Sequence, residues 1–288
     1  MASAVAAVML ITTASAAWAV PDLPANTDCS ANAVLAKLGV VEDRAAANML
    51  AEALRGPSAG GRCLLDVGDA DPGAANAATR RGAAGAQRVF VVGGPAAVPD
   101  SWLRSTLGIS DYVRIAGGNR WDTQAAVAAA IIAIATGKEV RQYDGAPPSA
   151  PQLPPNASCE EAAVIVKLGV VEDRAAANML AEALRALSIL GTSRCLIDAG
   201  DPSSGAAPVP DQVASAAQAA EVYIVGGPAA IPDAWLARHF DLAAQERVAG
   251  ADRWDTQARV AALIVSLAIA RSPAGHDAGP DEGIESIG

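Results

Sequence analysis

The stretch from Lys37 to Arg55 reads KLGVVEDRAAANMLAEALR, and the stretch from Lys167 to Arg185 repeats it residue for residue. Two more pairs of segments match, RVFVVGGPAAVPDSWL (Arg88–Leu103) with EVYIVGGPAAIPDAWL (Glu221–Leu236), and VRIAGGNRWDTQAAVAA (Val113–Ala129) with ERVAGADRWDTQARVAA (Glu246–Ala262). The offset between matching residues drifts only from 130 to 133, so the few insertions fall between segments, where loops tolerate them. The chain is therefore an internal duplication.

The duplication predicts the domain organisation. We expect one module over residues 20–140, a second over 158–271, a Pro-rich semi-rigid linker at 141–157, and a disordered tail at 272–288. Residues 2–19 carry no charge and close on Ala17-Trp18-Ala19, which is typical of a signal peptide (1–19) and of a secreted protein. Because no basic residue follows Met1, a buried N-terminal helix is the alternative for this segment.

Within each copy, short apolar runs alternate with helical patterns. In the first copy we expect strands at Val34–Gly39, Cys63–Val67, Arg88–Val92 and Tyr112–Ala116, and helices at Glu42–Arg55, Ala74–Arg81, from Pro99–Asp100 onward, and Arg120–Thr136. Strands and helices that alternate in this way form a parallel sheet with helices on both faces. The predicted fold class is α/β, with two tandem Rossmann-like modules.

The composition excludes some classes of protein. With 52% hydrophobic and 18% charged residues, the chain of 288 residues is too apolar to be disordered as a whole. Its net charge of −10 and its lack of a Lys/Arg-rich run argue against nucleic-acid binding. A local arginine site for an anionic ligand remains compatible with this balance.

The four cysteines lie two in each copy. Their positions predict one disulfide per copy, Cys29–Cys63 and Cys159–Cys195, although four cysteines allow three pairings. A zinc site is the weaker alternative, because no C-x-x-C pair exists and His239 and His276 are far from the cysteines in sequence. We therefore predict no metal.

The segments that follow the third and fourth strands resemble a known family. V-x-V-V-G-G-P-A-A-V followed by R-x-A-G-x-x-R-[aromatic]-x-T is similar to the cell-wall-binding repeat type 2 family of surface-layer and wall-associated proteins. The matching residues are Val89–Val98 with Arg114–Thr123 and Val222–Ile231 with Arg247–Thr256, together with the D-x-x-A-A-x-x-L-A stretches Asp43–Ala51 and Asp173–Ala181. The resemblance implies Rossmann-like modules that bind anionic wall polymers non-covalently at the cell surface.

This chain differs from the family pattern in three ways. The family commonly carries three tandem repeats that pack together, and this chain has two, which leaves room for self-association. Trp121 and Trp254 stand where the family usually has Tyr, and Asn119 stands where the second copy keeps Asp252.

The best candidates for a ligand site are the two Arg-Trp-Asp-Thr motifs. An arginine beside a helix N-terminus can pair with a phosphate or carboxylate, and the tryptophan could stack on a sugar; alternatively, both residues only build the repeat. The glycine pairs that follow two strands either admit a ligand or make a turn. The candidate ligand-binding residues are Arg120, Trp121, Asp122, Thr123, Arg253, Trp254, Asp255, Thr256, Gly93, Gly94, Gly226 and Gly227.

Other motifs point to no chemistry. The G-x-G-x-x-G fingerprint and the P-loop are absent, so no nucleotide cofactor is expected. Gly56–Gly60 matches G-x-S-x-G but follows a helix and precedes a strand, the reverse of a nucleophile elbow. Loop acids at Asp66, Asp69, Asp71, Asp198 and Asp201 could hold a cation but are more typical of a solvated loop. Glu42-Asp43 and Glu172-Asp173 open helices, where acids suit the helix dipole.

The sequence thus predicts a secreted, non-catalytic protein with no cofactor. The resemblance implies that it binds an anionic polysaccharide or teichoic-acid-like polymer of the cell wall. Two alternatives stay open. One is a surface α/β hydrolase or nucleotide-dependent enzyme, and the other is an assembly protein that needs a partner repeat.

Overall fold

The computed structural model describes residues 23–55, 61–68, 77–143, 145, 152–188, 194–205, 207–240, 242 and 245–272. The predicted signal peptide, the Gly56–Gly60 motif, Asp69, Asp71 and His276 lie outside these residues, as does all but the first residue of the predicted tail.

Each copy folds into the same series of elements. The first contains β1 (Asn32–Ala36), α1 (Val41–Leu54), β2 (Leu64–Asp66), α2 (Ala77–Gly85), β3 (Arg88–Val92), α3 (Asp100–Trp102) with a π-helical extension (Leu103–Leu107), β4 (Val113–Ile115) and α4 (Arg120–Ala135). The second contains β5 (Ala162–Val166), α5 (Val171–Leu187), β6 (Leu196–Asp198), a 3-10 turn (Pro202–Ser204), α6 (Pro210–Ala217), β7 (Glu221–Val225), α7 (Asp233–His239), β8 (Glu246–Val248) and α8 (Arg253–Ala270).

The strands form two parallel four-stranded sheets, one in each copy. Their orders are β2-β1-β3-β4 and β6-β5-β7-β8. In the first sheet Leu35 of β1 lies between Leu65 of β2 and Val91 of β3. The central strands are buried on both faces, as expected for a parallel sheet covered by helices on each side. This confirms the predicted α/β fold with two tandem Rossmann-like modules.

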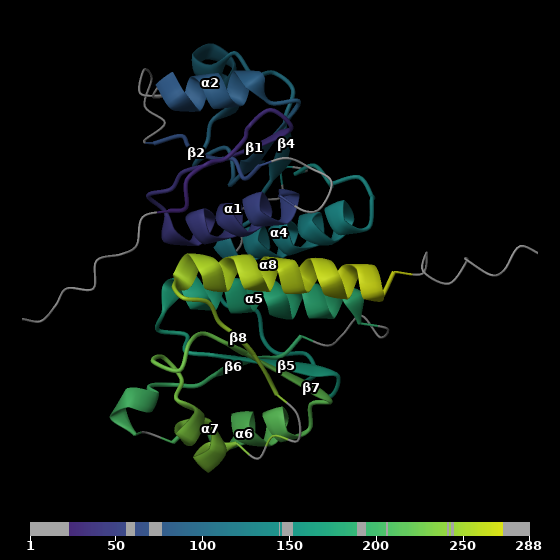
Figure 1. The fold of residues 1–288 in the computed structure, drawn as a ribbon. Coiled ribbons are helices and arrows are strands. Elements are labelled where there is room, and N and C mark those ends of the chain that lie inside the picture. Colours follow the sequence, from purple (N-terminus) through teal and green to yellow (C-terminus); the bar gives the residue numbers. More distant parts are fainter. Residues whose placement is uncertain are drawn as a thin grey trace, which may run out of the picture.

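Four helices lie between the two sheets. Figure 1 shows α1 and α4 of the first module stacked on α5 and α8 of the second, with the sheets beyond them and α2, α6 and α7 outermost. The largest apolar cluster runs through this layer and includes Met49 and Ile131 from one module and Met179 and Ile264 from the other. Smaller clusters fill the outer face of each sheet. The two modules therefore share one core.

The disulfides join Cys29 to Cys63 and Cys159 to Cys195, as predicted, and none of the four cysteines is free. Each disulfide holds an extended segment against an edge strand. The Asn26 side chain accepts a hydrogen bond from the Leu64 amide (2.7 Å) and donates one to the Leu64 carbonyl (2.8 Å). Asn156 contacts Leu196 in the same way (2.8 and 3.0 Å), so part of the predicted linker belongs to the second module.

Within the described residues, no helix combines the length and the apolar character needed to cross a membrane.

Candidate functional site

The Arg-Trp-Asp-Thr motifs begin α4 and α8, and several of their residues build the helix start. Asn119 Oδ1 accepts hydrogen bonds from the Trp121 and Asp122 amides (2.7 and 3.0 Å), and Asp252 caps α8 in the same way (2.8 and 2.9 Å). Asparagine and aspartate are both good N-caps, so this difference between the copies leaves the cap intact.

The threonines tie the preceding loop to the helix. The Thr123 hydroxyl donates to the Asn119 carbonyl (3.0 Å) and accepts from the Gly117 amide (3.1 Å). Thr256 makes the equivalent bonds to Asp252 and Gly250 (3.0 and 2.9 Å). A Cβ on Gly117 would lie 2.3 Å from the Asp122 Cβ, so the glycine of the motif is required for this close approach.

The two tryptophans are interface residues. Trp121 is 5% exposed and Trp254 is 3% exposed, so neither presents a ring face to solvent. The Arg174 guanidinium, from the second module, lies 5.3 Å from the centre of the Trp121 ring, and Arg44 of the first module lies 5.3 Å from that of Trp254. Each indole thus contacts a cation of the other module, an attraction typical of buried Arg–Trp pairs. The sequence left stacking on a sugar and a structural role open, and this geometry favours the structural role.

The motif arginines take part in an ion-pair network between the modules. Arg120 donates to Glu42 (2.7 Å), and Arg174 approaches the same carboxylate (3.5 Å). The arrangement is repeated around Glu172, which pairs with Arg253 and with Arg44 (3.5 Å).

We call these four arginines and two glutamates the arginine seam. Its guanidinium groups outnumber its carboxylates by four to two, although the chain as a whole carries a net charge of −10. The side chains of Arg120 and Arg253 are 44% and 29% exposed. A guanidinium has five N–H donors, so each of these arginines can pair with its glutamate and still bind an added anion.

An aspartate lies beside the seam in each module, Asp43 partly buried and Asp173 buried. Burial, and then the neighbouring Glu42, raises the pKa of Asp43 to about 6. Burial and Glu172 likewise raise the pKa of Asp173 to about 6, against a smaller lowering effect of Arg253. Within the described part of the chain, neither carboxyl has a hydrogen-bond partner.

The first glycine of each pair makes room for these carboxyls. Gly93 and Gly226 have φ of +109° and +115°, and a Cβ on them would lie 3.4 and 3.0 Å from the Asp43 and Asp173 carboxylates. Gly94 and Gly227 use their carbonyls to close the next turn, accepting from the Ala97 amide and the Ala230 amide (both 2.9 Å). The first glycine of each pair is therefore accounted for by the turn and by the neighbouring aspartate, whereas a Cβ on Gly94 or Gly227 would meet no atom within 4 Å.

Two arginines, one buried and one partly buried, fix these glycine turns, and the sequence analysis did not single them out as site residues. Arg114 is 3% exposed and donates to the carbonyls of Gly93 (2.7 Å) and Val98 (2.8 Å). Arg247 holds Gly226 and Ile231 in the same way (2.7 and 2.9 Å). In the sequence, these arginines are the first arginine of the R-x-A-G-x-x-R pattern in each copy, and that position could have indicated their role.

The glycine turn, the start of α1 and the loop before α4 all lie at the carboxyl ends of strands, where α/β proteins place ligands. The glycine turn follows β3, the Glu42-Asp43 helix start follows β1, and the Arg120 loop follows β4. In the order β2-β1-β3-β4 the strand order reverses between β1 and β3, and the carboxyl ends of the strands at such a switch point are the usual place of a ligand. Each module therefore has its two seam arginines beside the carboxyl ends of its strands at this point.

The predicted loop acids have structural partners. Asp66 accepts from the Leu38 and Gly68 amides (3.1 and 2.9 Å), Asp198 does the same for Leu168 and Gly200, and Asp201 pairs with Lys167 (2.7 Å). In the part of the chain that the structure describes, no three acidic, histidine or cysteine side chains gather as metal ligands. His239 packs its ring against Trp235, with centroids 4.9 Å apart.

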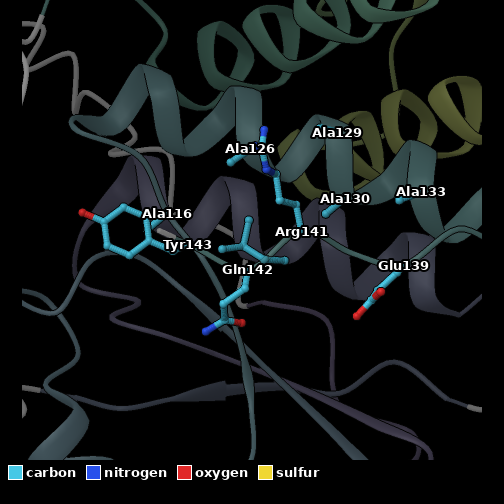
Figure 2. A pocket seen from close by; sticks show the side chains of 10 residues that line it. Ala116, Ala126, Ala129, Ala130, Ala133, Glu139, Arg141, Gln142 and Tyr143 are labelled. Atoms are coloured by element: carbon cyan, nitrogen blue, oxygen red, sulfur yellow. The ribbon is translucent and has the colours of Figure 1, made fainter. Parts of the chain in front are cut away.

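A hollow of about 300 Å³ lies on the first module away from the predicted site residues. Figure 2 shows its floor, formed by Ala126, Ala129, Ala130 and Ala133 of α4, with the Arg141 side chain above it. The second copy has Arg259 and Leu263 at the places of Ala126 and Ala130, so this alanine floor is not repeated there.

Comparison with known proteins adds two solved structures. No protein-family model and no curated protein matches the chain. Cwp6 from Clostridium difficile shares 16% identity at a TM-score of 0.35, covering 82% of this chain and 32% of that one. Cwp8 from Clostridium difficile shares 16% identity at a TM-score of 0.33, covering 85% and 39%. The chain thus spans about a third of the length of these proteins, and likenesses this weak carry no argument about function.

Proposed function

We propose that this chain is a secreted, non-catalytic protein that stays at the cell surface by binding an anionic wall polymer non-covalently, as a member of the cell-wall-binding repeat type 2 family. The resemblance of both copies to the family repeat supports the role. The arginine seam supplies the chemistry and is the observation on which the proposal rests. It concentrates four guanidinium groups beside the carboxyl ends of the strands at the two switch points of an otherwise acidic protein.

Two further features agree with this role. Disulfides persist in oxidising compartments, so the two bridges suit a protein outside the cytosol. The duplication presents the motif arginines twice, and two weak sites on one repeating polymer bind more strongly together than either does alone. A long anionic polymer with repeating units can occupy both sites at once and so retain the protein at the wall.

The test is a pull-down of residues 20–288 on purified walls of the producing organism, before and after mild acid extraction of the anionic polymers. We expect retention on intact walls, loss of retention after extraction, and weaker binding as salt is raised, because salt screens exposed charges over about 8–10 Å. Failure to bind intact walls would refute the proposal.

A double variant, Arg120→Ala with Arg253→Ala, tests the seam itself. It should lose most of the retention. Arg55→Ala is the matched control, because Arg55 is an exposed arginine just beyond the opposite end of α1 and pairs only with Glu52 among the described residues. Equal binding by both variants would show that the polymer is held elsewhere.

A further inference from the structure

The contacts between the two modules are reciprocal. Asn48 of α1 donates to Gln257 of α8 (2.9 Å), and Asn178 of α5 donates to Gln124 of α4 (2.9 Å). All four side chains are at most 1% exposed. Each asparagine is in turn fixed by a buried arginine of its own module, at 2.6 Å from Arg62 and 2.8 Å from Arg194. A pseudo-two-fold axis therefore relates the modules.

The arginine seam follows the same symmetry. Arg44 contacts Glu172 and Trp254 of the second module, and Arg174 contacts the equivalent Glu42 and Trp121 of the first. We define the inner face of a module as α1 with α4, or α5 with α8. Each inner face thus makes equivalent contacts to the other.

The residues that make these contacts are also the same in type. Helix α1 lies within the stretch that is identical in the two copies, and so does α5 except for its last two residues, Ala186 and Leu187. Six of the seven buried positions of α4 match those of α8 in type, in the pairs Trp121/Trp254, Thr123/Thr256, Gln124/Gln257, Val127/Val260, Ala128/Ala261 and Ile131/Ile264, whereas Leu263 stands at the place of Ala130. Each inner face therefore carries the polar, charged and aromatic groups that it meets on the other.

We infer that the inner face is self-complementary, and that its partner can be the same module of a second copy of this chain. An interface in which residue i meets j and j meets i is the isologous type found in two-fold dimers. In the intact chain the linker keeps the two modules at a high effective concentration, so the pair within one chain forms first. Modules that are no longer joined by the linker also pair with the same module of another chain.

Cutting the linker of the folded full-length protein tests this inference. Both disulfides lie within a module, so a protease site placed within residues 146–151 leaves no disulfide between the halves, which are then held together by non-covalent contacts. Native mass spectrometry distinguishes the halves by mass. The cut protein starts as mixed pairs, each of one first module and one second module. We expect the modules to exchange until first–first, mixed and second–second pairs approach the roughly 1:2:1 ratio of random pairing. A cut sample that is unfolded and refolded with its disulfides intact defines the end point.

Two outcomes would overturn the inference. One is mixed pairs alone, even after refolding, and the other is free single modules. Arg44→Glu is the matched variant, because it opposes like charges once in a mixed pair, twice in a pair of first modules and never in a pair of second modules. On dilution, the expected order of pair stability is then second–second, mixed, first–first. Wall binding plays no part in this assay, so its result is independent of the proposed function.

Discussion

Replacing Asp173 by asparagine should stabilise the protein at neutral pH. Burial and the adjacent Glu172 raise the pKa of Asp173 from 3.8 to about 6, and the residue is only 9% exposed. At about 1.4 kcal/mol per pKa unit, this rise corresponds to roughly 3 kcal/mol of destabilisation when the carboxyl is ionised. Asparagine has nearly the same shape and carries no charge.

The sign of the pH dependence follows from proton binding. The folded state holds the Asp173 proton more tightly than the unfolded chain, so the contribution of this group to stability is fully present below about pH 4 and is lost as pH rises through about 6. The asparagine variant has no such loss. It should match the parent protein near pH 4 and exceed its unfolding free energy by ~1–3 kcal/mol at pH 7.5.

Urea denaturation at both pH values, with the disulfides intact, measures this difference. Other groups titrate in both proteins alike and cancel. Asp211→Asn, at an exposed position in the first turn of α6, controls for the substitution itself. If Asp173→Asn destabilised the protein at pH 7.5, the aspartate would have a favourable partner. If the advantage of the variant persisted unchanged at pH 4, the charge of Asp173 would not be its cause. Either result would refute the reasoning.

Three more perturbations probe the shared core and the bridges. Asn48→Ala should lower the unfolding free energy by about 2–4 kcal/mol in urea titrations, because it removes a buried acceptor of Arg62 and the donor to Gln257. Replacing Cys159 and Cys195 by serine should lower it by about 3–4 kcal/mol, as the chain-entropy model gives for a bridge with a separation of 36 residues. Calorimetry should show a single transition for both modules, and Met49→Ala, which opens a cavity in the shared cluster, should shift that transition without splitting it.

Strong local patterns predicted much of the fold. The third strand was expected at Arg88–Val92 and lies there, and the helix expected from Arg120 ends at Ala135, one residue early. The first strand begins at Asn32 instead of Val34, because it pairs with β3 from Asn32 onward, and it ends at Ala36, three residues before the expected Gly39. The second helix was expected at Ala74–Arg81, and its described part, Ala77–Gly85, continues four residues further, since Ala and Gly give a weak periodic signal.

The arrangement of the modules could not be read from the same patterns. The sequence suggested two modules joined by a linker, whereas their inner helices form one layer. Helix α4 is apolar around most of its circumference, which indicated burial but not the partner. Arg44 and Arg174 looked like ordinary helix residues, because their roles depend on a glutamate and a tryptophan more than 50 residues away in sequence.

The hydrogen bonds that cross the helical layer also determine which positions can change together in evolution. Asn48 and Asn178 occupy the same place in the two repeats, yet each depends on a glutamine of the opposite repeat. A substitution at Asn48 therefore calls for compensation at Gln257, and one at Asn178 for compensation at Gln124. Related sequences should show correlated changes along these crossed pairs, while repeat-equivalent positions drift separately, and the two halves should evolve as one unit.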